Sequence, residues 1–215
     1  MIKKNLRASS TYADIIYQDI KDEILTGKLK PNEKITISQV AQHFNVSITP
    51  VREAIQRLAT EEYLNVTSRS DVKVIDLAKE DYGKIIDLIR LLDIASIKKA
   101  ITEFSAENIE KLKGMHLKLQ AQYHSNNLKQ YLNQNNAIHR QIWVMYDNKY
   151  IYQTLSQALD KFMLIASNYP SYYNPDLIAK SWTHHCRLIE AIEGRDFTLA
   201  ERTLIEHWSP DFFIV

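Results

Sequence analysis

A pair of short amphipathic helices separated by a tight turn is the feature that most restricts how this chain can fold. The first helix carries its apolar residues at helical spacing: Val40, Ala41 and Phe44. Asn45 tolerates the left-handed backbone that ends such a helix. Pro50 suits the first turn of the next helix, where a missing N–H costs nothing, and Ser47 or Thr49 can cap it. The pattern predicts a helix-turn-helix whose second helix begins near residues 47 to 49.

The second of these helices has an apolar inner face and a polar outer face. Its inner residues are Val51, Ala54, Ile55 and Leu58. The outer residues can meet the major groove and the phosphates of DNA: Ser47, Ile48, Thr49, Arg52 and Arg57. Residues 63–67 and 72–75 alternate as two short strands, and the turn between them carries Arg69 and Ser70, which suit a minor-groove or phosphate contact. Together with an amphipathic helix at residues 12–26, these elements predict a winged helix.

This segment resembles the GntR-type bacterial transcription regulators. The resemblance rests on Ile24-Leu-Thr-Gly27, Leu29-Lys-Pro31, Val46-Ser-Ile-Thr-Pro-Val-Arg-Glu-Ala-Ile55 and Arg57-Leu58. Three positions depart from the family pattern: Ile48 replaces a base-reading arginine, Asn32 a turn glycine and Asp71 the wing-tip glycine. An arginine that binds guanine contributes roughly 1–3 kcal/mol of discrimination, so Ile48 implies an unusual operator or weaker sequence selection. A thymine methyl contact is the natural substitute, whereas Asp71 places a negative charge close to DNA.

Length and composition predict two domains, residues 1–77 and residues 78–215, with the boundary near Asp76–Lys79. With 45% hydrophobic residues, 25% charged residues and only four glycines, the chain is expected to be soluble and largely helical. A net charge of +1 is too small for a protein that coats nucleic acid nonspecifically. DNA affinity must therefore come from local cations and from two copies of the module. A single cysteine, Cys186, fits a reducing cytoplasm, and no signal peptide or membrane span is expected.

The second domain is predicted to be an antiparallel all-α bundle of about six helices. Helical periodicity and turn residues place them at about 80–102, 106–124, 128–146, 149–167, 174–193 and 196–208. The overall fold class is therefore mostly α, with a small β-hairpin as the wing.

A histidine set supplies the chemistry of the predicted bundle. Asn135 and His139 share the apolar stripe of the third bundle helix, and His185 lies on the stripe of the fifth. His207 lies on the last helix. It and His185 are equally far in sequence from Asp196, which lies in the turn between their helices. If these two helices form an antiparallel hairpin, the two histidines therefore lie side by side. Three imidazoles and an amide oxygen suit zinc, nickel or another divalent first-row metal with an open position. A single histidine on an apolar face is more often a hydrogen-bonded core residue than a metal ligand, and it is the joint placement of the three that favours a metal site.

This arrangement also resembles the FCD effector domain of the FadR branch of the GntR family. The matching residues are Asn135-x-x-Ile-His139, His185-x-x-Leu-Ile-x-Ala-Ile192 and Asp196-x-x-x-Ala200, leading to His207. The family generally has aspartate at position 135, and a neutral amide there should weaken a dication's binding. A metal-free polar effector pocket is the alternative.

Arg90 has two interpretations on the first bundle helix. It can form an internal ion pair with Asp93 or Asp87, or its planar guanidinium can bind the carboxylate of an acidic effector. The family resemblance implies such a carboxylate metabolite.

The combined expectation is a homodimeric regulator of metabolic or transport genes that binds two half-sites of a palindromic operator and responds to an effector. No step of this scheme requires catalysis. Two alternatives remain: a histidine-ligated metalloenzyme, for which no Glu or Asp base is evident in the cluster, and a winged-helix protein-interaction module.

Overall fold

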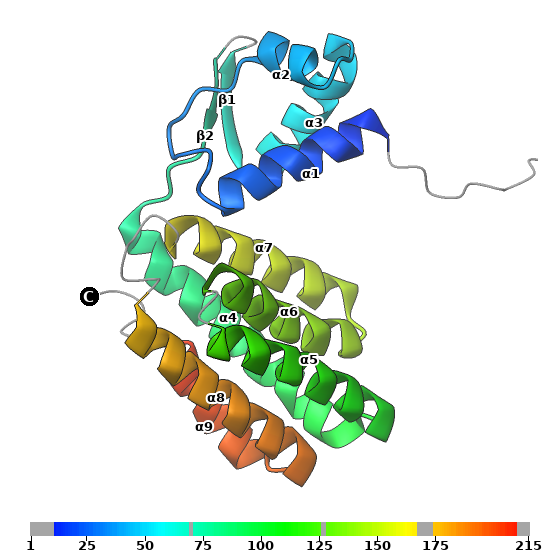
Figure 1. Ribbon diagram of the computed structural model, residues 1–215, viewed down its shortest axis with the longest axis vertical. Coiled ribbons are helices and arrows are strands. Elements are labelled where there is room, and N and C mark those ends of the chain that lie inside the picture. Colours follow the sequence, from blue (N-terminus) through cyan, green and yellow to red (C-terminus); the bar gives the residue numbers. More distant parts are fainter. Residues whose placement is uncertain (1–10, 69–70, 126–127, 167–173, 210–215) are drawn as a thin grey trace, which may run out of the picture. The chain divides into compact units, whose positions relative to one another are not determined.

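The computed structural model describes residues 11–68, 71–125, 128–166 and 174–209. The chain divides into two compact units, Met1–Leu77 and Ala78–Val215. Figure 1 shows helices throughout and a single hairpin in the described residues, so the predicted mostly α class is confirmed. None of the helices in these ranges is long and apolar enough to cross a membrane.

The first unit is a winged helix. Its helices are α1 (Tyr12–Leu25), α2 (Ile37–His43) and α3 (Ile48–Thr60), and its antiparallel hairpin joins β1 (Leu64–Ser68) to β2 (Asp71–Val74). The apolar residues of α1 and α3 pack together because both repeat at helical spacing: Ile16, Ile20, Ile24, Val51, Ala54, Ile55 and Leu58. The wing-tip residues Arg69 and Ser70 lie outside the described residues.

Local signals explain where these helices start and stop. Thr11 and Asp14 form a reciprocal capping box at the start of α1. Asn45 ends the turn after α2 with φ 53°, and Asn32 has φ 64°, so asparagine supplies the left-handed backbone at both turns. Ser47 precedes α3, but its side chain makes no capping hydrogen bond in the described structure, contrary to our expectation.

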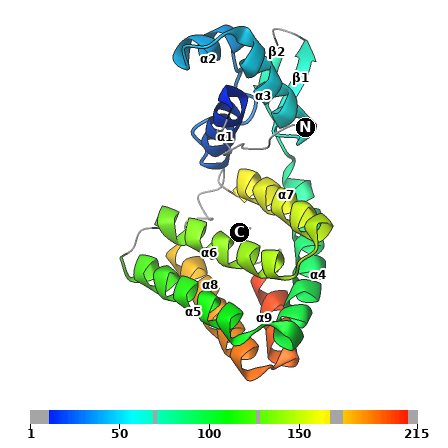
Figure 2. The ribbon, with the colours of Figure 1, turned by 90° about the vertical axis from the view of Figure 1, so that its right-hand side faces the viewer.

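The second unit is a helical bundle. Its described helices are α4 (Lys79–Glu103), α5 (Ala106–His124), α6 (Leu128–Met145), α7 (Lys149–Ala166), α8 (Pro175–Gly194) and α9 (Phe197–His207). The predicted ends differ from these bounds by about one residue, within the usual ambiguity of helix ends. Figure 2 shows α4 alongside α7 and α9, and α8 packs against both α5 and α9.

Polar residues at the turns mark where several of the bundle helices begin. Ser105, Asn148, Asn174 and Asp196 each accept a backbone N–H at the start of the following helix. Arg195 lies in the turn between α8 and α9 with φ 57°. Its guanidinium donates to the carbonyl oxygens of Ala100, Ile101 and Phe104 at the end of α4. A cation at this end of a helix also complements the helix dipole.

Candidate functional site

Three histidines from three helices meet in the core of the bundle. His139 of α6, His185 of α8 and His207 of α9 are all buried, and each can offer a ring nitrogen within 4.8 Å of the others. Their ring centroids are 5.0 Å apart in every pair. The structure therefore brings together the three imidazoles that the helical pattern placed on inward faces.

A buried carboxylate that we did not assign to the site orients one of these rings. The Nδ1 atom of His139 lies 3.0 Å from Oδ2 of Asp93, which is 1% exposed. The indole N–H groups of Trp143 and Trp208 donate to the same carboxylate over 2.7 and 2.8 Å. A proton on Nδ1 leaves the lone pair of His139 on Nε2, which is 3.1 Å from Nε2 of His207.

The sequence did contain a signal for Asp93. It lies in register with an apolar stripe of α4 formed by Ile86, Ile89, Ile97 and Ala100, all of them buried. We had considered Asp93 only as a partner for Arg90. Burying a carboxylate without partners is costly, so its place on an apolar stripe indicates that Asp93 has polar partners in the core, as the place of His139 does.

The state of His185 fits a metal ligand. Neither of its ring nitrogens has a hydrogen-bond partner among the residues that the structure describes. Burial lowers the pKa of His185 well below its usual value, and the neighbouring imidazoles lower it further. Burial likewise lowers the pKa of His207. Both rings are therefore neutral at pH 7, which is the form that binds metals.

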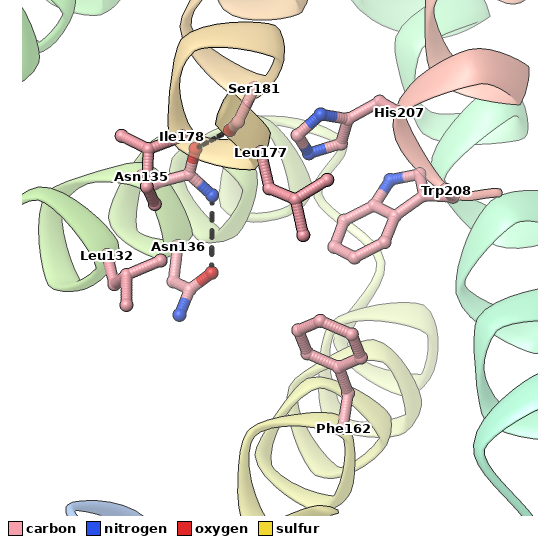
Figure 3. Close-up of a pocket in the computed structure, with 9 residues that line it drawn as sticks. All are labelled: Leu132, Asn135, Asn136, Phe162, Leu177, Ile178, Ser181, His207 and Trp208. Atoms are coloured by element: carbon pink, nitrogen blue, oxygen red, sulfur yellow. Dashed lines mark hydrogen bonds between the residues drawn. The ribbon is translucent and has the colours of Figure 1, made fainter. Parts of the chain in front are cut away.

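Asn135 lies beside this cluster and faces a small cavity. Figure 3 shows Asn135, His207, Trp208 and Phe162 around it. The amide oxygen of Asn135 accepts a hydrogen bond of 3.0 Å from Ser181, and its N–H group donates to Asn136 over 3.4 Å. A carbonyl oxygen has two lone pairs, so it can still act as a ligand. The cavity has room for about 10 Å³, the size of one water molecule.

Arg90 is not part of this cavity lining. Its guanidinium forms an ion pair of 2.6 Å with Asp87, one of the two partners considered from the sequence. Asp93, the other one, is turned into the histidine cluster. A role for Arg90 in binding an anionic effector thus stays a prediction.

Four of the residues predicted to contact DNA are exposed at the start of α3. Ser47, Ile48, Thr49 and Arg52 are all exposed there. Arg57, which we placed on the outward face, is instead directed to α1. Its guanidinium donates to Asp14 over 2.7 Å and lies 4.3 Å from the centre of the Tyr17 ring. The position is half-buried because α1 crosses α3 at this turn, so Arg57 joins the two helices.

The charge on Asp71 is compensated within the wing. Thr67 donates to its carboxylate over 2.6 Å, and Lys73 and Lys34 lie 3.7 and 4.0 Å away. The hydrogen bond from Thr67 and these two cations lower the pKa of Asp71. The carboxylate of Asp71 stays ionised at neutral pH and partly neutralises the positive charge of Lys34 and Lys73.

Comparison with known proteins agrees with both units. Residues 12–74 match the family described as "Bacterial regulatory proteins, gntR family", and residues 84–209 match the FCD domain. The chain belongs to the GntR family and carries an FCD domain. It is a transcription regulator rather than an enzyme, so the metalloenzyme alternative is wrong.

Several relatives of this FCD regulator have curated descriptions. The HTH-type transcriptional regulator McbR of Escherichia coli is 26% identical over 120 residues, which cover 56% of this chain and 54% of McbR. The uncharacterized regulator YdhC of Bacillus subtilis is 23% identical over 91% of this chain and 87% of its own length. The gluconate operon transcriptional repressor of B. subtilis is 23% identical over 95% of this chain and 85% of its own.

A solved structure of E. coli McbR/YncC has the same fold. It superposes with a TM-score of 0.77 at 20% sequence identity, and the match covers 93% of this chain and 94% of that one.

Proposed function

We propose that this FCD regulator binds a palindromic operator as a homodimer and that a metal-anchored effector controls this binding. The observation that carries the proposal is the cluster of His139, His185 and His207, oriented by Asp93 and lying beside a cavity. A regulator of this kind works by differential affinity: the effector must bind one arrangement of the protein better than the other.

The chemistry of the cluster suits a divalent first-row metal such as zinc or nickel. His139, His185 and His207 would hold the ion, with the amide oxygen of Asn135 as a further ligand. All four donors are neutral, so the nearest anionic charge is that of Asp93, which acts through His139. The bound metal would supply a Lewis acid to which an effector carboxylate can coordinate.

A small carboxylate is the effector class that these features support. A metal centre with an open position favours an anionic oxygen ligand. One relative is named for the gluconate operon, and gluconate is a carboxylate. The cavity holds about one water molecule as it stands, so a metabolite would have to widen it on binding. We propose that the regulated genes serve metabolism or transport of such a compound, with Arg90 as a second anion contact if it leaves Asp87.

Two observations favour a dimer. Among the described residues of the winged helix, Arg57, Lys34 and Lys73 are already ion-paired, so a second copy of the unit on the same operator would add to the binding free energy. Helix α4 also exposes Leu88 and Leu91, which are 40% and 67% accessible and lie one turn apart. Exposed leucines on neighbouring turns form an apolar patch suited to a partner.

Metal content and DNA binding test the two halves of the proposal separately. Protein purified without a histidine tag should contain about one metal ion per chain by elemental analysis, and the His185→Leu variant should contain none. His124→Leu removes an exposed histidine of α5 and is the matched control. A wild type that lacks metal yet binds its effector would refute the metal-anchored site.

For DNA, salt-dependent binding to duplexes enriched from a random pool is expected, and Arg52→Ala should abolish it. Arg202→Ala, which removes an exposed arginine of α9, should leave it unchanged. The absence of binding to any duplex at low salt, with and without added metal, would refute the regulatory function.

A further inference from the structure

The start of α3 presents an exposed aliphatic side chain where a DNA-reading helix is most accessible. Ile48 is the first residue of α3 and is 44% exposed, whereas the apolar residues of the inner face are buried. Arg52 lies one helical turn later on the same side, and both residues border a hollow lined by residues 34–38. Burial in the core therefore does not explain why residue 48 is apolar.

Three of the cations in the described part of the winged unit are already paired with carboxylates. Arg57 is paired with Asp14, while Lys34 and Lys73 share the carboxylate of Asp71. Arg52 makes no ion pair with any residue that the structure describes. On α3 it is the arginine available for a guanine or a phosphate. Sequence selection by this helix must then depend on more than guanidinium contacts.

The major-groove edge of DNA contains one prominent apolar group, the C5 methyl of thymine. The N-terminal residues of a recognition helix are those that contact base edges in this groove. An exposed isoleucine gains from covering a methyl group, because both lose contact with water, and it offers nothing to the polar edges of guanine or cytosine.

We propose that Ile48 reads a thymine methyl, so that each half-site of the operator contains a thymine at the position that faces this residue. The inference rests on the proposed DNA-binding function and adds the base class that the chain selects. Arg52 and the hydroxyls of Ser47 and Thr49 would supply the neighbouring polar contacts.

The test begins with duplexes enriched from a random pool by the full-length protein, with metal present. In the enriched duplex, each thymine in turn is replaced by deoxyuridine, which removes the methyl group and nothing else. At one thymine per half-site, affinity should fall by about fourfold, the value for one buried methyl group, and by about fifteenfold when both half-sites are changed.

The variants assign the effect to Ile48. In Ile48→Ala the same replacement should change affinity by less than about twofold, since most of the aliphatic surface that covers the methyl group is removed. Ile15→Ala is the matched control, because Ile15 of α1 belongs to the same unit and is 45% exposed. It should retain the full effect of deoxyuridine. Ile48→Arg should enrich duplexes with guanine at that position in place of thymine.

The outcomes separate this inference from the function on which it rests. If no duplex is enriched, the DNA-binding function itself fails. If duplexes are enriched but contain no thymine whose methyl matters, or if Ile48→Ala remains as sensitive to deoxyuridine as the wild type, the function stands and the role of Ile48 is overturned.

Discussion

Replacing His185 by leucine should stabilise the metal-free protein while it removes the metal site. Both ring nitrogens of His185 are buried without hydrogen-bond partners in the described residues. Leucine has a similar volume and no polar atom, so the substitution removes the cost of burying two unsatisfied groups. If His185 served packing alone, the substitution would instead lower the stability of the metal-free protein.

The magnitude follows from the contacts of the ring. Each unsatisfied buried nitrogen costs about 1–3 kcal/mol, which gives roughly 2–6 kcal/mol for the pair. The variant loses the ring contacts with His139 and His207, each about 0.5–1.5 kcal/mol. The net expectation is a free energy of unfolding about 1–3 kcal/mol higher than that of the wild type.

Metal should reverse this order. A ligand at a free concentration 1,000 times its dissociation constant stabilises the folded protein by about 4 kcal/mol, and this gain is open to the wild type alone. If the wild type is less stable than His185→Leu in chelator but more stable in excess metal, His185 is a metal ligand.

Tryptophan fluorescence during urea unfolding measures the effect in the relevant unit. All three tryptophans, Trp143, Trp182 and Trp208, belong to the FCD unit. The His124→Leu control should change the unfolding free energy little in either condition. A His185→Leu variant that is less stable than the wild type in chelator would show that the two nitrogens are satisfied in the apoprotein, and the reasoning would be wrong.

Four further predictions concern other residues of the two units. Asp93→Asn should lower metal affinity by about 10–100-fold in a chelator competition, and Asp160→Asn, which changes another buried carboxylate, should leave it unaltered. Asn135→Asp should raise affinity in the same titration, and an unchanged value would remove residue 135 from the site. The pKa of Asp14 is lowered to about 2 by Arg57 and Thr11, so its stabilising effect is complete above the usual 3.8 and is lost as the pH falls through 2. The difference in urea midpoint between wild type and Asp14→Asn, followed by circular dichroism, should shrink accordingly, and a constant difference would exclude the ion pair as its cause. Arg195→Ala should lower the unfolding free energy of the FCD unit by about 1–3 kcal/mol, whereas Arg195→Gly should lower it by about 1 kcal/mol less because glycine adopts the left-handed backbone freely.

Local signals made the element boundaries predictable. Ser105, Asn174 and Asp196 act at the helix starts where their side-chain chemistry placed them. The convergence of His185 and His207 followed from helical spacing and one antiparallel turn. Both inferences depend on residues close together in the sequence, where backbone geometry limits the alternatives.

Contacts between distant residues were not predictable in the same way. Arg57 was placed outward because the pattern of α3 alone does not reveal that α1 carries Asp14 and Tyr17 beside it. Asp93 lies 46 positions before His139, and only the packing of α4 against α6 shows that their side chains meet. A helical pattern shows which face is buried but not which helix covers it.

Helix α4 connects the histidine cluster to the chain that leaves the first unit. Asp93 contacts the histidine cluster, and α4 begins at Lys79, two residues after the first unit ends at Leu77. The 14 helical steps from Lys79 to Asp93 correspond to about 21 Å of helix. A tilt of about 10° pivoting near Asp93 would move the first turn of α4 by about 4 Å, roughly the spacing of one base-pair step. A small rotation of α4 at the histidine cluster would thus displace the chain next to the winged helix by about one base-pair spacing.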